Sequence, residues 1–272
     1  MRIRWLLAPA VVALAMAGCG ESKLESGSSA THGATVLRYS INSKAVGKSM
    51  PQTAVVPHGG GQGRPLLVFL HGRGGAQNES NANADFTKAL SALGKRAPDV
   101  VFPSGDEASY WHTRNSGDWP TYVLNEVIPA AVKKTGANPN RIAIGGISMG
   151  GWGAFNIARL APSRFCAVGG HSAAFWQQSG DSAPGAFDDA EDFQQDDLIA
   201  LAQSQGRSPW GQAKLWMDGG NDDPFRTAGE AFSQAAGINM KHWPGGHSAG
   251  YWHAHYTDYL GFYANALANC GG

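Results

Sequence analysis

Residues 141–154 of this 272-residue chain read R-I-A-I-G-G-I-S-M-G-G-W-G-A. The apolar run Arg141–Ile147 predicts a buried strand, and Met149–Ala161 predicts a helix, so the chain must turn sharply at Ser148. The glycines two residues before and after this serine lack a Cβ and allow the strand and the helix to lie close together. A strand, a sharp turn and a helix in this order are typical of an α/β fold with a mostly parallel sheet.

The remainder of the chain repeats this alternation of short apolar runs and helical patterns. The runs predict further strands at Thr35–Ile41, Leu66–Leu70, Val100–Pro103, Phe165–Gly169, Ala213–Met217 and Ile238–Trp243. The intervening patterns predict helices at Pro120–Thr135, Asp192–Gln205, Thr227–Ala236 and Tyr251–Ala268. We therefore expect one α/β domain over residues 34–272, with a mostly parallel central sheet and helices on both faces.

The N-terminus has the pattern of an export signal. Arg2 and Arg4 precede an apolar run, Trp5–Ala17, that is too short to span a bilayer. The sequence M-A-G-C at 16–19 resembles a bacterial lipobox, which predicts a signal peptide over residues 1–18 and lipid attachment at Cys19. An ordinary secretory signal, in which this cysteine has no role, is the alternative. The Ser- and Gly-rich residues 19–33 predict a flexible tether.

These features predict an exported protein, anchored by lipid on the outer side of the cytoplasmic membrane or in the periplasm or cell envelope. The formal net charge is zero, which gives no reason to expect nucleic acid as a partner. Export places Cys166 and Cys270 where a disulfide can persist, but the apolar surroundings of Cys166 fit a buried free thiol equally well.

Ser148 is the candidate nucleophile. Its G-x-S-x-G setting between a strand and a helix is the nucleophile elbow, in which a strained turn exposes the serine Oγ. A serine hydroxyl needs a base to take its proton, and donors to hold the oxyanion that forms on the substrate. The sequence L-H-G-R-G-G at 70–75 follows a predicted strand and offers such donors. We expect the two donors to be the backbone N–H groups of Arg73, in this loop, and of Met149, the residue after the nucleophile. His71 is expected to order the loop rather than act as the base.

The acid and the base are expected near the C-terminal end of the chain. The sequence D-G-G-N-D-D-P-F at 218–225 places three carboxylates at a strand end. Asp223 is our candidate for the acid that orients the base, Asp222 is its rival, and Asp218 is assigned to the strand. His247 follows two glycines in the predicted loop between the last strand and the last helix, and it is the candidate base.

The other histidines are less suitable as the base. His242 ends a predicted strand, and His253 and His255 fall within the last predicted helix. No H-E-x-x-H pattern, Cys/His metal spacing, P-loop or dinucleotide fingerprint is present in the sequence, so we expect neither a metal nor a cofactor. Two roles are open for the aromatic loop Ser109–Trp119: its rings line a cleft, or they pack beneath the loop.

Over residues 64–260 the chain resembles the esterase D and antigen 85 mycolyltransferase group of α/β-hydrolases, which includes feruloyl and siderophore esterases. The resemblance rests on L-H-G-R-G-G, G-I-S-M-G-G, G-N-D-D-P-F and G-G-H-S. It implies an α/β-hydrolase fold, a Ser148–Asp223–His247 triad, the Arg73 and Met149 amides as oxyanion donors, and no cofactor. Members of this group hydrolyse carboxylic esters or transfer the acyl group to another alcohol.

The expected activity is therefore that of a serine carboxylic ester hydrolase, acting on a small-molecule or glycan-linked ester through an acyl-enzyme on Ser148. Two alternatives are open. The same triad can serve an acyltransferase of the mycolyltransferase kind. A catalytically silent binding lipoprotein can also retain the fold, because fold does not dictate function.

Overall fold

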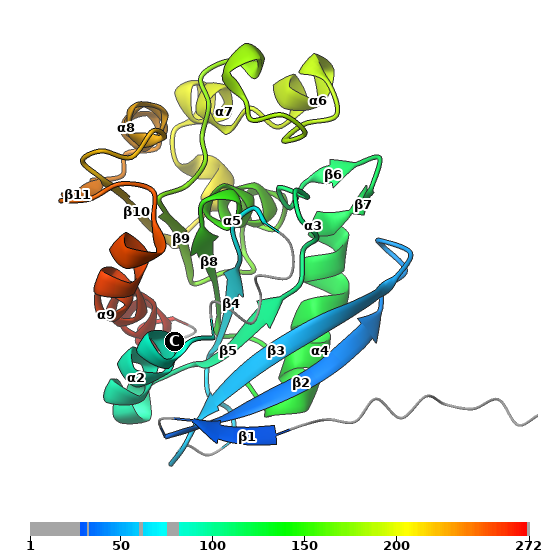
Figure 1. Cartoon of the computed structure of the whole chain (residues 1–272), viewed down its shortest axis with the longest axis vertical. Coiled ribbons are helices and arrows are strands. Elements are labelled where there is room, and N and C mark those ends of the chain that lie inside the picture. Colours follow the sequence, from blue (N-terminus) through cyan, green and yellow to red (C-terminus); the bar gives the residue numbers. More distant parts are fainter. Residues whose placement is uncertain (1–27, 32, 60–61, 75–81, 271–272) are drawn as a thin grey trace, which may run out of the picture.

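The structure, a computed structural model, describes residues 28–31, 33–59, 62–74 and 82–270. Within them, a nine-stranded sheet carries helices on both faces (Figure 1). The strands of this sheet are β1 Ser28–Thr31, β2 Ala34–Asn42, β3 Ser49–Pro57, β4 Leu66–Leu70, β5 Asp99–Pro103, β8 Ile142–Ile147, β9 Ala167–His171, β10 Lys214–Gly220 and β11 Lys241–Trp243. A small hairpin is formed by β6 Thr113–Arg114 and β7 Gly117–Asp118.

The helices alternate with the strands along the chain. They are α2 Ala84–Ala92, η1 Gly94–Arg96, α3 Trp119–Thr121, the π-helical turn η2 Tyr122–Val127, α4 Ile128–Thr135, α5 Met149–Leu160, η3 Ser179–Asp181, α6 Ala190–Gln195, α7 Leu198–Gln205, η4 Ser208–Trp210, α8 Arg226–Ala235 and α9 Ala249–Ala268. None of the helices in the described ranges is long and apolar enough to cross a membrane.

The strand order is β1-β2-β3-β5-β4-β8-β9-β10-β11. The six strands from β5 to β11 in this order pair in parallel, whereas β1, β2 and β3 form an antiparallel edge. The carboxyl ends of parallel strands meet at one edge of a sheet, so the loops after β4, β8, β10 and β11 come together there. The expected mostly parallel α/β-hydrolase fold is confirmed.

Alternate residues of the central strands face two separate cores. In β4, Leu66, Val68 and Leu70 belong to the core that includes α4 and α5. Leu67 and Phe69 belong to the core on the other face, beneath α2 and α9. Because both faces of the sheet are covered, its central strands are continuous apolar runs without a polar alternation.

Several elements differ from the sequence expectations. β3 and α2 were not predicted, and Asp192–Gln205 is divided between α6 and α7, because the Asp197 side chain caps the N-terminus of α7. Four residues of the segment assigned to the tether, Ser28–Thr31, pair with β2 as strand β1. The predicted signal peptide and Cys19 lie outside the described residues.

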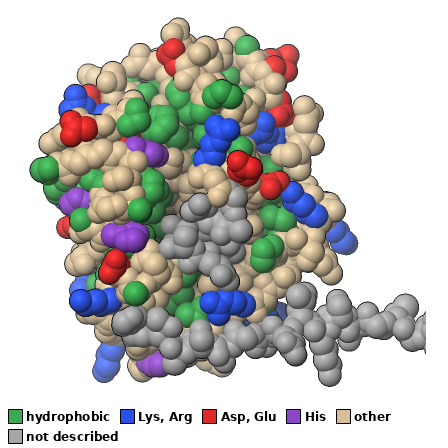
Figure 2. Space-filling model, in the orientation of Figure 1, with side chains coloured by type: hydrophobic (Ala, Val, Ile, Leu, Met, Phe, Trp, Pro, Cys, Tyr) green, Lys and Arg blue, Asp and Glu red, His purple; other side chains and the backbone are tan. Residues whose placement is uncertain are grey.

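The two cysteines of the domain form a disulfide. Cys166, just before β9, is bonded to Cys270, just after α9, across 104 positions of the sequence. The bond fastens the C-terminal helix to the sheet, which decides between the two possibilities that the sequence left open. On the face shown in Figure 2, basic and acidic side chains are interspersed.

Candidate active site

Ser148 lies at the turn between β8 and α5. Its backbone has φ 57° and ψ −118°, a conformation that non-glycine residues rarely adopt. The surrounding hydrogen bonds hold it in place: the Ser148 N–H donates to the His171 carbonyl at 2.9 Å, and the Ser148 carbonyl accepts from Gly151 and Trp152 at the start of α5. The strained turn between β8 and α5 therefore has the backbone geometry that the sequence predicts for a nucleophile elbow.

The glycines of the elbow are required by close packing. A Cβ on Gly146 would lie 2.5 Å from the Leu70 carbonyl oxygen, and a Cβ on Gly150 would lie 2.3 Å from the same atom. The loop after β4 also lies close to Ser148, since a Cβ on Gly72 would be 3.2 Å from the Ser148 Cβ. The elbow and the loop after β4 therefore form one unit at the carboxyl edge of the sheet.

His247 is brought to the serine by the loop between β11 and α9. Its Nε2 lies 2.8 Å from Ser148 Oγ, so the serine hydroxyl can donate to it. Ser248, the next residue, caps α9 by accepting the Tyr251 N–H, which fixes the end of the loop. The rings of Phe225 and Trp252 flank the imidazole edge-to-face, at 4.9 and 5.2 Å between centroids.

Asp223 completes the hydrogen-bonded chain. The His247 Nδ1–H donates to Asp223 Oδ2 at 3.1 Å, and the other carboxylate oxygen accepts the Phe225 N–H at 2.9 Å. Burial acts to raise the pKa of Asp223, but these hydrogen bonds and the neighbouring imidazole outweigh it and hold the pKa below its ordinary value. Asp222, the rival candidate, is exposed to solvent. The ionised carboxylate facing His247 is therefore that of Asp223.

His71 orders the loop after β4, as expected. Its Nδ1–H donates to the Gly72 carbonyl at 2.7 Å, and its Nε2 accepts the Gly105 N–H at 2.8 Å. Burial lowers the pKa of this ring to about 4, which keeps it neutral. Arg73 follows in the same loop, and Met149 is the first residue of α5, immediately after the nucleophile.

The remaining histidines of the C-terminal region have partners away from the triad. His242 lies 3.7 Å from Glu230, and His253 lies 3.1 Å from Asp85. His255 stacks on Trp243, with 4.0 Å between the ring centroids. None of the three is within the Ser148–His247–Asp223 chain of hydrogen bonds.

A second, fully buried histidine–aspartate pair lies beneath the site and was missed by the sequence reasoning. His171 Nδ1 donates to Asp218 Oδ2 at 2.7 Å, and Asp218 also accepts from Trp216 Nε1 and from the Tyr251 and Tyr259 hydroxyls. The two tyrosines belong to α9, so this network docks the helix that follows His247. The only sequence signal is the unusual number of tyrosines in α9, which gives no partner.

The aromatic loop after β5 packs beneath the surface. Trp111 and Trp119 are fully buried, and the Trp111 ring lies so close to Gly105 and Gly153 that a Cβ on either glycine would overlap it. The Trp111 Nε1–H donates to the carbonyl of His71, which ties this loop to the loop after β4. Of the two roles that the sequence left open for these tryptophans, the structure supports packing.

The parallel sheet, the strained serine and the Ser148–His247–Asp223 hydrogen bonds define a serine hydrolase of the α/β-hydrolase fold. Residues 43–263 match the family described as "Putative esterase". The chain belongs to this family of esterases, enzymes that hydrolyse carboxylic esters. No curated protein sequence matches the chain as a relative.

Solved structures with the same fold include several esterases. A ferulic acid esterase is similar with a TM-score of 0.72 and 23% identity, over 87% of this chain and 100% of that one. An S-formylglutathione hydrolase from Agrobacterium tumefaciens has a TM-score of 0.70 and 19% identity, over 89% and 98%. The enterobactin esterase of Shigella flexneri has a TM-score of 0.65 and 17% identity, over 86% of this chain and 58% of that one. At these identities the likeness shows a shared fold.

Proposed function

We propose that the chain hydrolyses carboxylic esters through an acyl-enzyme on Ser148. The observation that carries this proposal is the continuous chain of hydrogen bonds from Ser148 Oγ through the His247 ring to Asp223, at 2.8 and 3.1 Å. In this chain the imidazole has its proton on Nδ1 and its lone pair on the Nε2 that faces the serine. This is the tautomer a general base requires.

The proposed reaction has two halves. Ser148 Oγ attacks the acyl carbon while His247 Nε2 accepts the serine proton, and the same proton then passes to the departing alcohol as the acyl–oxygen bond breaks. In the second half, His247 takes a proton from water, the hydroxide attacks the acyl-enzyme, and the proton returns to Ser148. The N–H groups of Arg73 and Met149 are the proposed donors to the oxyanion of each half.

Aromatic rings beside the imidazole suggest the kind of acyl group. Phe225 and Trp252, whose rings lie 4.9 and 5.2 Å from the His247 ring between centroids, are both partly exposed. A flat aromatic acyl group can stack on such rings, at a gain of about 0.5–1.5 kcal/mol for each pair. We therefore propose aromatic acyl esters as substrates, in preference to short aliphatic ones.

Labelling by a fluorophosphonate probe tests the proposed nucleophile. The purified wild type, Ser148→Ala and His247→Ala are treated with the probe, and the labelled peptide is located by mass spectrometry. Labelling of the wild type at Ser148 that is lost in both variants supports the proposal. A folded wild type that is not labelled, or is labelled at another residue, contradicts it.

Product analysis then separates hydrolysis from acyl transfer and tests the acyl preference. Phenyl-propenoate and acetate esters of 4-nitrophenol are compared, with and without glycerol, glucose or trehalose. Free acid as the main product in every case supports a hydrolase, and acylated glycerol or sugar as the main product identifies a transferase. A kcat/KM for the acetate that equals or exceeds that for the aromatic ester contradicts the acyl preference.

We further propose that the domain is exported and held at a membrane through a lipid on Cys19. The Cys166–Cys270 disulfide supports export, because disulfides persist in oxidising compartments and are rare in the cytosol. Detergent-phase partitioning of the full chain that is lost in Cys19→Ser tests the anchor. Equal partitioning of the two proteins into the aqueous phase contradicts it.

A further inference from the structure

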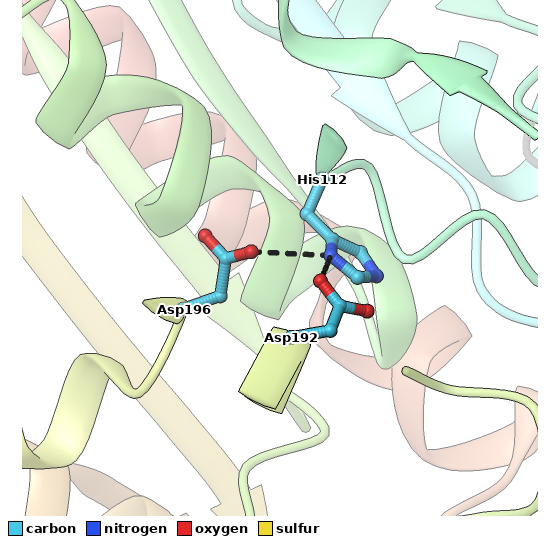
Figure 3. Close-up of side chains that lie close together, drawn as sticks. All are labelled: His112, Asp192 and Asp196. Carbon is cyan, nitrogen blue, oxygen red and sulfur yellow. Dashed lines mark hydrogen bonds and ion pairs between the residues drawn. The ribbon is translucent and has the colours of Figure 1, made fainter. Parts of the chain in front are cut away.

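A histidine and two aspartates converge outside the proposed triad. His112, in the loop after β5, is fully buried, and its Nδ1 lies 3.2 Å from Asp196 Oδ2 and 3.3 Å from Asp192 Oδ1. Figure 3 shows the imidazole pointing between the two carboxylates, one from α6 and one from the residue that ends it. The three ligand atoms lie within 4.8 Å of one another.

The hydrogen bond on the far side of the ring fixes what His112 presents to the carboxylates. His112 Nε2 lies 3.1 Å from the Ala186 carbonyl oxygen, which can only accept, so Nε2 carries a proton. In the neutral ring, Nδ1 therefore directs a lone pair at the two carboxylates, which also present only lone pairs. Three acceptors that face one another need a positive charge among them, which is supplied either by a second proton on the His112 ring or by a bound metal ion. A backbone carbonyl that holds the second ring nitrogen is also what orients histidine ligands in metal sites.

The outer carboxylate oxygens already have donors. Asp192 Oδ2 accepts the Asp188 N–H at 2.7 Å, and Asp196 Oδ1 pairs with the Arg159 guanidinium. These contacts orient both carboxylates and leave the inner oxygen of each directed at Nδ1. The single guanidinium offsets one of the two negative charges, so an excess of one negative charge is left when the ring is neutral.

The spacing of the inner atoms suits a small divalent ion. Zinc bonds of about 2.0–2.1 Å in a tetrahedral arrangement place neighbouring ligand atoms about 3.3 Å apart. The two separations from His112 Nδ1 are 3.2 and 3.3 Å. One nitrogen and two carboxylate oxygens form a donor set that zinc accepts, with water as a fourth ligand.

We propose that His112, Asp192 and Asp196 bind a divalent cation of the zinc class. The site has a structural role that is separate from the ester chemistry. It joins α6 to the loop after β5. Through the Asp196–Arg159 ion pair it also joins α6 to α5, the helix that follows Ser148. His112 also packs edge-to-face on Trp152 of α5, at 5.6 Å between centroids. Bound metal therefore restrains α6 against α5, the helix that begins directly after Ser148.

Metal binding to the folded protein tests this proposal without any measurement of activity. The chain is stripped with a chelator and titrated with Zn²⁺ by calorimetry, and with Co²⁺ by visible absorption, which reports tetrahedral coordination. We expect one ion per wild-type chain and a higher Tm with Zn²⁺ at about 100 times its Kd. In Asp192→Asn, which keeps an oxygen able to accept the Asp188 N–H, we expect an affinity at least about 100-fold lower and no rise in Tm.

Glu191→Gln is the matched control, because it removes an exposed carboxylate from the same turn of α6 without touching the cluster. It should bind Zn²⁺ as the wild type does. Absence of stoichiometric binding to the wild type overturns the proposal, and so does equal binding by Asp192→Asn, which would place the metal at other histidines. A proton found on His112 Nδ1 by ¹⁵N NMR in the presence of Zn²⁺ also overturns it.

Discussion

Asp223→Asn is expected to disable the enzyme while leaving its fold intact. In the wild type, one carboxylate oxygen of Asp223 accepts the Phe225 N–H and the other accepts the His247 Nδ1–H. An asparagine must keep its carbonyl oxygen toward Phe225, because only an acceptor can satisfy that backbone N–H. Its NH₂ group then faces Nδ1 as a donor, and the imidazole must move its proton to Nε2, the atom that should accept the proton of Ser148.

This loss of the general base is expected to lower kcat about 10⁴-fold, as the wrong tautomer does in other serine hydrolases. The loss corresponds to about 5.5 kcal/mol of transition-state stabilisation. The assay is steady-state hydrolysis of a 4-nitrophenyl ester, with circular dichroism and Tm to confirm the fold. The matched control is Asp222→Asn, which neutralises the exposed neighbouring carboxylate and should stay within about twofold of the wild type. An Asp223→Asn variant within tenfold of the wild type, or an equal loss in Asp222→Asn, would refute the assignment of the acid.

Three further results are expected. Cys270→Ser opens a loop of 104 residues and should lower the free energy of unfolding by about 4–5 kcal/mol. Thermal unfolding of the wild type and the variant, with and without reductant, measures this loss, and an unchanged Tm would contradict it. Gly150→Ala places a Cβ 2.3 Å from the Leu70 carbonyl oxygen and should lower the free energy of unfolding by at least about 3 kcal/mol. The control, Gly180→Ala, meets nothing within 4 Å and should change this free energy by less than about 0.5 kcal/mol. Equal effects of the two variants in denaturant unfolding would count against the packing argument. Burial raises the pKa of Asp99 to about 6, so its charged form is disfavoured in the folded chain and the penalty grows between pH 4 and 6. The free energy of unfolding of Asp99→Asn, measured relative to that of the wild type, should therefore rise by about 3 kcal/mol as the pH is raised from about 3 to about 8. A difference between the two proteins that stays constant over this pH range would show that the pKa of the Asp99 carboxyl is not raised.

The sequence predicted the central strands and the main helices well. β4 was predicted with its observed bounds, and β8 and α5 within one residue at each end, because buried parallel strands are continuous apolar runs and a serine elbow fixes where each element ends. β3 was missed, since its prolines weaken the strand pattern and its pairing with β2 and β5 is a tertiary matter. The break between α6 and α7 was also missed, because both sides of Asp197 continue the helical pattern.

By itself, the sequence determined the α/β class and the position of the strained serine that is the proposed nucleophile, because both follow from residues adjacent in the chain: an apolar strand, a glycine-flanked serine and a helix. It also placed Asp223 and His247 at strand ends, where their side chains reach the same edge of a parallel sheet. The tertiary structure alone decided that Asp223 rather than Asp222 faces the imidazole, that Cys166 is bonded to Cys270, and that His112 meets two aspartates some 80 residues further along. These depend on which side chains the folded sheet and helices bring together across long separations, and such contacts leave no periodic or spaced pattern in the chain.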